Sequence, residues 1–271
     1  MPHLDPPEGD TGWPAGEGTL GVVGVAPWAT LDFLEAFYRG VSASKDWHYP
    51  RVIVDVNTKL PSRGRHLELG ETDPSPYIEA TIRELAAAGA TAVVVACNTA
   101  HILQARWSAG HTCEVISIIS ATIAAVEKSR PQGPVVVLAS RSLTQSGTYQ
   151  AALSDAGLAS LGLSHADVDR VARAIEVVKT AGSLDDRAQE DMADIARTAA
   201  AGGALAAIVG CTELSSAGPI FRDAGLAVFD SNLELANAAL DHCTSGGRGV
   251  ALGATADSPR SAERDQSAPE L

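Results

Sequence analysis

No stretch of this 271-residue chain approaches the roughly 18 consecutive apolar residues that a membrane-spanning helix needs. Its first residues, Met1 to Glu8, lack the basic start and the apolar run of a signal peptide. We therefore expect a cytoplasmic protein with no membrane partner.

Cysteine is scarce as well, because the chain has four, without a CxxC pair and without zinc-finger spacing to a histidine. So few cysteines in so long a chain indicate neither a disulfide framework nor a structural metal. The sequence also lacks a phosphate-binding loop and a Gly-x-Gly-x-x-Gly motif at a helix start. We predict no metal and no cofactor, neither a nucleotide nor pyridoxal phosphate.

Positive charge is in deficit, with 20 Lys and Arg against 33 Asp and Glu and a net charge of −13. Nucleic acid binding needs clustered Lys and Arg, so we expect no nucleic acid partner. An acidic substrate would require only a local basic pocket. Both ends of the chain are rich in small, charged or turn-forming residues, and we predict disordered tails at 1–17 and 244–271.

Between these tails, apolar β-branched runs alternate with helical patterns. Continuous apolar strands of this kind are typical of parallel sheets covered by helices on both faces. The sequence therefore predicts an α/β fold that binds its ligand at the carboxyl ends of the strands. We expect strands at 20–25, 51–56, 91–96, 134–139, 205–210 and 228–230, with helices from about 31, at 76–88, after 119, near 166–180, at 186–202 and near 232–242.

Two of the cysteines occupy matching positions at the ends of predicted strands. Cys97 follows Val93-Val94-Val95-Ala96, and Cys211 follows Ala206-Ala207-Ile208-Val209-Gly210. Two thiols delivered in this way suggest a symmetric site with one sulfur on each face of a ligand. Such a site suits a reaction that removes a proton from one face of a carbon and returns one to the other. Cys113 and Cys243 lack this setting, and we expect them to be buried apolar residues.

The two cysteine segments carry a resemblance to a known family. Cys-Asn-Thr-Ala-His at 97–101 and Gly-Cys-Thr-Glu-Leu at 210–214 closely resemble the paired signatures of the aspartate/glutamate racemase superfamily. These enzymes invert amino acids with two cysteines and no cofactor. Weaker matches occur at 24–30, 57–63, 146–149 and 178–182, so the resemblance covers about residues 19–243.

The resemblance implies two similar lobes, each a mostly parallel sheet flanked by helices, related by pseudo-twofold symmetry with the site between them. The first lobe would comprise residues 18–117 with the closing helix 229–243, and the second residues 118–228. Homodimers are common in the family, and we expect one here.

By the same resemblance, Cys97 and Cys211 act as opposed base and acid. A thiol of pKa about 8.5 is a poor base for an amino acid α-proton, so polar neighbours must help to form the thiolate. The site must also stabilise charge on the substrate carboxylate. Asn98, Thr99 and Thr212 offer amide, hydroxyl and helix-start donors for that carboxylate.

Glu213 and His101 each have two interpretations. Glu213 either accepts and orients the proton of the second thiol or is an acidic residue favoured at a helix start. His101 lies one helical turn beyond Cys97, where packing or orientation of its neighbours is favoured over catalysis.

Four further residues are candidates for substrate binding. Arg63 and Lys179 are candidates for a side-chain carboxylate, since a guanidinium binds it in two places and an ammonium acts as a point charge. Asn57 lies in the family's Asn-Pro-x-Ile-Pro-Asp-Arg-like segment. Leu143 stands where the family has a Thr that contacts the substrate carboxylate. Ser142 is a candidate replacement, with Ser140 and Thr144 as alternatives.

Several functions stay open at this point. The resemblance favours an amino acid racemase with an acidic or related substrate, and a maleate-type cis–trans isomerase is the alternative within the superfamily. Outside enzymes, the alternative is a ligand-binding protein that kept the cleft and lost turnover. Leu143 favours this binder, and the intact pair of cysteines argues against it.

Overall fold

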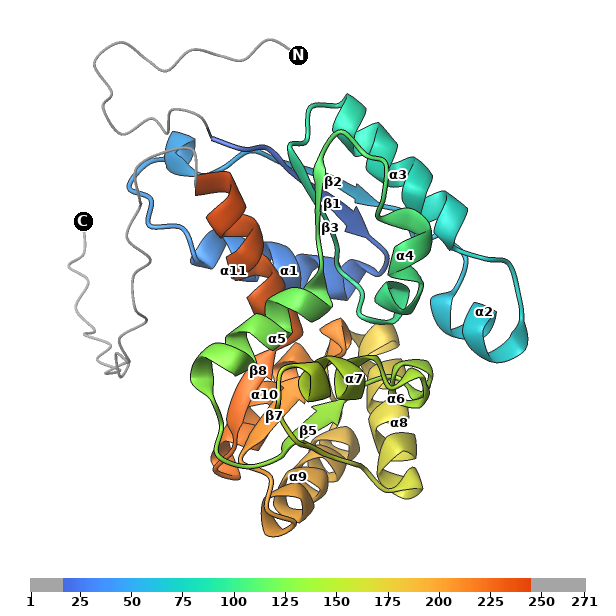
Figure 1. The fold of residues 1–271 in the computed structure, drawn as a ribbon, viewed down its shortest axis with the longest axis vertical. Helices are drawn as coiled ribbons and strands as arrows, with labels where there is room; N and C mark the ends of the chain where they lie inside the picture. The colour runs from blue at the N-terminus through green and yellow to red at the C-terminus, as the bar shows by residue number, and fades with distance from the viewer. Residues whose placement is uncertain (1–16, 245–271) are drawn as a thin grey trace, which may run out of the picture.

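The computed structural model describes residues 17–244 (Figure 1). The predicted disordered tails lie outside the described residues, apart from their innermost residues Glu17 and Thr244. The two ends of the described chain meet, because the backbone N–H of Gly18 donates to the carbonyl of Cys243 over 3.1 Å.

Two four-stranded sheets, each wholly parallel, form the centres of two lobes. The first has the order β2-β1-β3-β4 and the second the order β6-β5-β7-β8, so the same topology occurs twice. This confirms the predicted two-lobed α/β fold. The strands are β1 Leu20–Gly24, β2 Val52–Val56, β3 Ala92–Val95, β4 Glu114–Ile116, β5 Val135–Leu138, β6 Ser160–Leu161, β7 Ala206–Val209 and β8 Ala227–Asp230.

The helices cover both faces of each sheet, which is why the central strands are apolar without interruption. In β3, Ala92 and Val94 face the core that runs between the lobes, whereas Val93 and Val95 face the helix α3 on the outer side. The helices of the first lobe are α1 Pro27–Arg39, α2 Arg63–Leu69, α3 Ser75–Ala87 and α4 Gln104–Trp107, with the 3₁₀ helices η1 Asp46–His48 and η2 Thr99–Leu103.

The second half of the chain repeats this arrangement. Its 3₁₀ helix η3, Thr212–Ala217, follows β7 as η2 follows β3. Its α-helices are α5 Ile118–Ser129, α6 Arg141–Ser146, α7 Thr148–Asp155, α8 His165–Ala181, α9 Asp186–Ala201, α10 Gly218–Asp223 and α11 Ser231–Thr244.

The helices α5 and α11 pack against each other between the two sheets, and α11 also packs against α1 (Figure 1). One hydrophobic core therefore continues from the first lobe to the second, from Val22 and Phe33 to Val137 and Ile208. The expected boundary between residues 228 and 229 falls inside β8, which pairs with β7 in the second sheet. Within residues 17–244, no helix combines the length and the apolar character needed to cross a membrane.

Candidate active site

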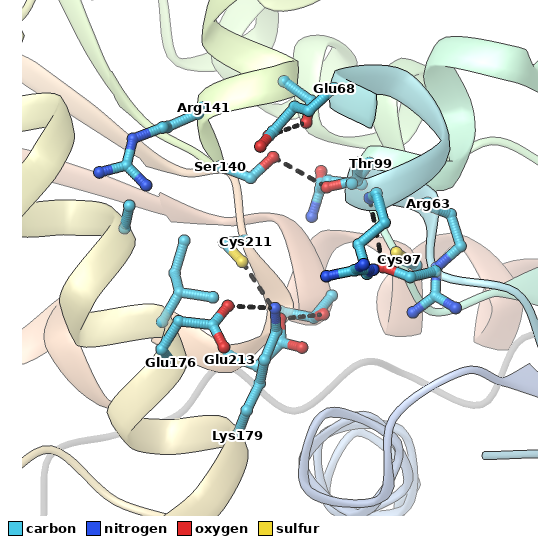
Figure 2. Close-up of a pocket in the computed structure, with 18 residues that line it drawn as sticks. Arg63, Glu68, Cys97, Thr99, Ser140, Arg141, Glu176, Lys179, Cys211 and Glu213 are labelled. Carbon is cyan, nitrogen blue, oxygen red and sulfur yellow. Dashed lines mark hydrogen bonds and ion pairs between the residues drawn. The ribbon is translucent and has the colours of Figure 1, made fainter. Parts of the chain in front are cut away.

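The two cysteines of the repeated topology line one cavity. Cys97 lies two residues beyond the end of β3, and Cys211 lies two residues beyond the end of β7, the corresponding strand of the second sheet. The cavity of about 200 Å³ lies between the lobes, and α2, α6 and α8 also contribute to its wall (Figure 2). Its lining residues are Ser62, Arg63, Gly64, Arg65, Glu68, Cys97, Asn98, Thr99, Ser140, Arg141, Ser142, Ala172, Ile175, Glu176, Lys179, Cys211, Thr212 and Glu213.

Cys211 is a buried thiol, 6% exposed, that donates a hydrogen bond to Oε2 of Glu213 over 3.1 Å. Burial raises the pKa of Cys211 well above its ordinary value, and the charge of Glu213, the hydrogen bond to it and the Cys97 thiol add to this rise. The backbone N–H of Glu213 acts in the opposite direction. Cys211 is therefore held as a protonated thiol beside a carboxylate that can accept its proton.

Glu213 is itself buried and also accepts a hydrogen bond from the hydroxyl of Thr212 over 3.3 Å. A carboxylate between a thiol and a hydroxyl is placed for proton transfer, which favours the first of the two interpretations of this residue.

Lys179 extends from α8 towards Cys211 and Glu213, and its Nζ donates to Oε1 of Glu176 over 2.7 Å (Figure 2). Burial lowers the pKa of Lys179, but the hydrogen bond to Glu176 and the charges of Glu213, Glu176 and Cys211 outweigh it, so the net pKa is raised. Lys179 therefore supplies a permanent positive charge beside the second cysteine.

Arg63 differs from the other cations of the cavity. Its Nη1 donates to the carbonyl of Pro61 over 3.1 Å, and its buried Nε has no hydrogen-bond partner. In the part of the chain that the structure describes, Arg63 forms no ion pair, so its charge is available to a ligand. Each of the other cations has an acidic partner: Arg65 pairs with Glu71, Arg141 with Asp169 and Lys179 with Glu176.

Hydroxyl groups of the second lobe line the cavity beside α6. The Oγ of Ser140 lies 2.9 Å from Oγ1 of Thr99, and Ser142 donates to Oε1 of Glu68 over 2.6 Å, so both contacts join the lobes. Leu143 is 1% exposed and packs in the core rather than lining the cavity. The hydroxyls of Ser140 and Ser142 therefore line the part of the cavity wall beside α6, and Leu143 does not.

The two predicted ligand residues with amide side chains, Asn57 and Asn98, have partners within the protein. Asn57 does not line the cavity, because it holds the turn after β2, where its Oδ1 accepts from the backbone N–H of Lys59 over 3.0 Å. Asn98 lines the cavity, but its amide forms buried hydrogen bonds with Tyr149 and Ser231. Both side chains thus have structural partners.

His101 is 4% exposed, and both of its ring nitrogens have backbone partners. Its Nδ1 lies 2.9 Å from the carbonyl of Cys97, and the N–H of Ile118 donates to Nε2 over 3.3 Å. A neutral ring that donates from Nδ1 satisfies both contacts. Burial lowers the pKa of His101 to about 4, which keeps the ring neutral. His101 therefore orients the loop of Cys97 and has no nitrogen left for substrate.

The neutral ring of His101 should make stability depend on pH. The unfolded chain binds a proton near pH 6.5 and the folded ring only near pH 4, so acidification from 6.5 to 4 should remove about 3 kcal/mol from the free energy of unfolding. In His101→Gln the loss of about 3 kcal/mol that comes from protonation of this ring should be absent. Urea unfolding at pH 7.5 and 4.5 measures it, with the exposed His165→Gln as control. An equal loss in both variants would contradict this role.

Several cavity residues were not predicted from the sequence, among them Arg65, Glu68, Arg141 and Glu176. One signal was available for Glu176: residues 172, 175, 176 and 179 recur at helical spacing and share one face of α8. Glu68 carried no such signal, because its partner Ser142 lies in the other lobe.

The remaining cysteines are structural. Cys113 and Cys243 are buried in hydrophobic cores, as predicted, and burial raises the pKa of Cys243 to about 12. All four cysteines are free thiols. Among residues 17–244, no three His, Cys, Asp or Glu side chains gather as a metal ion would require.

A sequence profile of the Asp/Glu/Hydantoin racemase family matches residues 21–239. The chain belongs to this family. Racemisation, an isomerase reaction, is therefore the class of activity that its membership supports. The family name covers amino acids and hydantoins alike, so the substrate class has to be inferred from the residues that line the cavity.

Solved structures of racemases have a similar fold. The chain is similar to an aspartate racemase from Picrophilus torridus, with 24% identity, a TM-score of 0.73 and coverage of 85% of this chain and 95% of that one. It is also similar to an aspartate racemase homologue from Pyrococcus horikoshii, with 19% identity, a TM-score of 0.68 and coverage of 84% of this chain and 99% of that one. A glutamate racemase isoform from Bacillus anthracis has 17% identity and a TM-score of 0.63, with coverage of 86% of this chain and 85% of that one. At these identities the likeness establishes the fold.

Proposed function

We propose that this family member is a racemase of acidic amino acids that uses Cys97 and Cys211 in place of a cofactor. The observation that carries the proposal is the pair of thiols, from equivalent strands of the two lobes, on the wall of a single small cavity. One of them, Cys211, donates a hydrogen bond to the carboxylate of Glu213.

In this mechanism the substrate Cα lies between the two sulfurs. The thiolate of one cysteine takes the α-proton, the electron pair left behind delocalises into the α-carboxylate, and the thiol of the other cysteine donates its proton to the opposite face. When Cys97 is the base, Cys211 is the acid, in the protonated state that its surroundings favour. The reverse reaction uses the Cys211 thiolate as base and the Cys97 thiol as acid. In the free enzyme, Glu213 forms this thiolate by taking the proton of Cys211, and the proton is returned through Glu213 when Cys211 is again the acid.

The charges around the cavity favour a substrate with a second carboxylate. Among residues 17–244 the Arg63 guanidinium has no acidic partner, and Lys179 adds a positive charge near Cys211. The hydroxyl of Thr99 and the backbone N–H groups at the starts of η2 and η3 are suited to the α-carboxylate, whereas the Thr212 hydroxyl has its acceptors in Glu213 and Ala96. A substrate of the aspartate or glutamate type provides both anionic groups.

Arg63→Ala should lower kcat/KM for aspartate or glutamate by about 30-fold, the equivalent of about 2 kcal/mol of lost charge-assisted binding. Turnover of alanine, which has no second carboxylate, should stay within about twofold of the parent. Arg65→Ala is the matched control, because Arg65 lines the same cavity and pairs with Glu71. Equal losses for aspartate and alanine in Arg63→Ala would remove Arg63 from the specificity site.

Incubation with single enantiomers in deuterated water tests the proposed function itself. Inversion of aspartate or glutamate, followed by chiral chromatography and mass spectrometry, is the expected result. Conversion of maleate to fumarate without inversion would indicate the cis–trans isomerase instead. Thermal stabilisation by these ligands without exchange or inversion would indicate a binding protein.

A further inference from the structure

Buried hydrogen bonds join the chain segments on either side of the two cysteines. Ala96 precedes Cys97, and Thr212 follows Cys211. The Oγ1 of Thr212 lies 3.4 Å from the carbonyl of Ala96 and 3.3 Å from Oε2 of Glu213, so its one proton is directed between these two acceptors. The segment leaving the second cysteine therefore contacts the segment entering the first.

A second link leads from Asn98 to the strand that carries Cys211. The Nδ2 of Asn98 donates to Oγ of Ser231 over 2.9 Å, and Ser231 donates to the carbonyl of Val209 over 2.7 Å. Val209 is the last residue of β7, two positions before Cys211. Because the single proton of the Ser231 hydroxyl goes to Val209, this hydroxyl must accept from Asn98, which fixes the orientation of the Asn98 amide.

Tyr149 contacts both cysteine segments at once. Its hydroxyl donates to Oδ1 of Asn98 over 2.7 Å, and its ring packs on Gly210, where an added Cβ would lie 3.0 Å from a ring carbon. Tyr149 is 1% exposed, and burial is the main cause that raises its pKa, so the hydroxyl keeps its proton. Any side chain at the residue before Cys211 would displace this ring.

From these contacts we infer that Tyr149, Asn98 and Ser231 form an interlobe clamp that sets the separation of the Cys97 and Cys211 sulfurs. Tyr149 and Ser231 are positioning residues, and the Asn98 side chain belongs to the clamp instead of binding substrate. A buried polar network with its members paired is rigid, and a misplacement of about 1 Å can cost about 10²-fold in rate. The inference rests on the proposed two-thiol reaction.

Tyr149→Phe and Ser231→Ala test the clamp, because each removes one hydroxyl and little volume. We expect kcat to fall 10- to 100-fold, with KM within about twofold of the parent. Inversion needs both sulfurs correctly placed on opposite faces of the substrate, whereas exchange of the α-hydrogen with solvent on one face needs only one sulfur. In deuterated water, the ratio of deuterium in recovered substrate to deuterium in product should therefore rise in both variants. Tyr38→Phe and Ser129→Ala, which remove hydroxyls outside the network, should leave both readouts unchanged.

A second measurement does not depend on turnover. Iodoacetamide labelling, followed peptide by peptide, should modify Cys211 at least fivefold faster in the clamp variants, with buried Cys243 as the internal reference. If the parent protein turns over no amino acid, the proposed function fails and this labelling still tests the clamp. An unchanged ratio of Cys211 to Cys243 labelling in both variants overturns the inference. A parallel rise at both cysteines also overturns it, since the hydroxyls would then stabilise the whole fold.

Discussion

Cys97→Ala and Cys211→Ala should each lower the rate of inversion by about three orders of magnitude, within the range of a lost general acid or base. Each variant keeps one thiol and so one face of the reaction, but inversion requires both. Because the equilibrium constant between enantiomers is one, kcat/KM must fall by the same factor from either enantiomer. Chiral chromatography of product formed from each enantiomer measures both values.

The chain offers matched controls for these two variants. Cys113 and Cys243 are buried apolar thiols away from the cavity, so Cys113→Ala and Cys243→Ala should retain the parental rate after correction for the folded fraction. Near-parental inversion by Cys97→Ala or by Cys211→Ala would rule out the two-thiol mechanism.

The second large effect is expected for Glu213→Gln, with a loss of about 10²-fold in kcat. Glutamine keeps the size of the side chain but cannot take up the proton of Cys211. Its neutral amide also removes two of the causes that raise the pKa of Cys211, so that pKa should fall. Turnover should therefore drop although the thiolate of Cys211 forms more easily. Two measurements together test this combination: kcat, and the pH dependence of Cys211 alkylation.

Glu176→Gln is the control for Glu213, because Glu176 is a carboxylate of the same cavity that pairs with Lys179 and not with a thiol. It should leave the alkylation profile of Cys211 in place. If Glu213→Gln shifts the alkylation profile but keeps turnover within about threefold of the parent, Glu213 is only a charged neighbour and not a proton acceptor.

Most of the fold was predictable from local patterns. The runs at 92–95 and 206–209 are apolar without interruption because both faces of the parallel sheets are covered, and the thiols follow where such strands end. The helix predicted at 76–88 is found at Ser75–Ala87, and the one at 186–202 at Asp186–Ala201, because apolar residues recur at helical spacing in both.

Long-range pairing was not predictable. The 7-residue α2 and the 6-residue α6 are too short to show a clear period, yet they carry Arg63, Glu68 and Ser142 to the cavity. Asn98 follows Cys97 in sequence, which suggested a role at the substrate. Its direction is set by Ser231, 133 residues away, and by Tyr149, neither of which any local signal connects to it.

The central claim is that two sulfurs act on opposite faces of one carbon, and the fate of the α-hydrogen tests it most directly. A single enantiomer of aspartate would be inverted in deuterated water, and the deuterium in product and in recovered substrate would be compared at low conversion. Two opposed thiols predict deuterium at Cα in nearly every product molecule and little in the recovered substrate. Product that keeps the original hydrogen would mean that one group removes and returns the same proton, which contradicts this account.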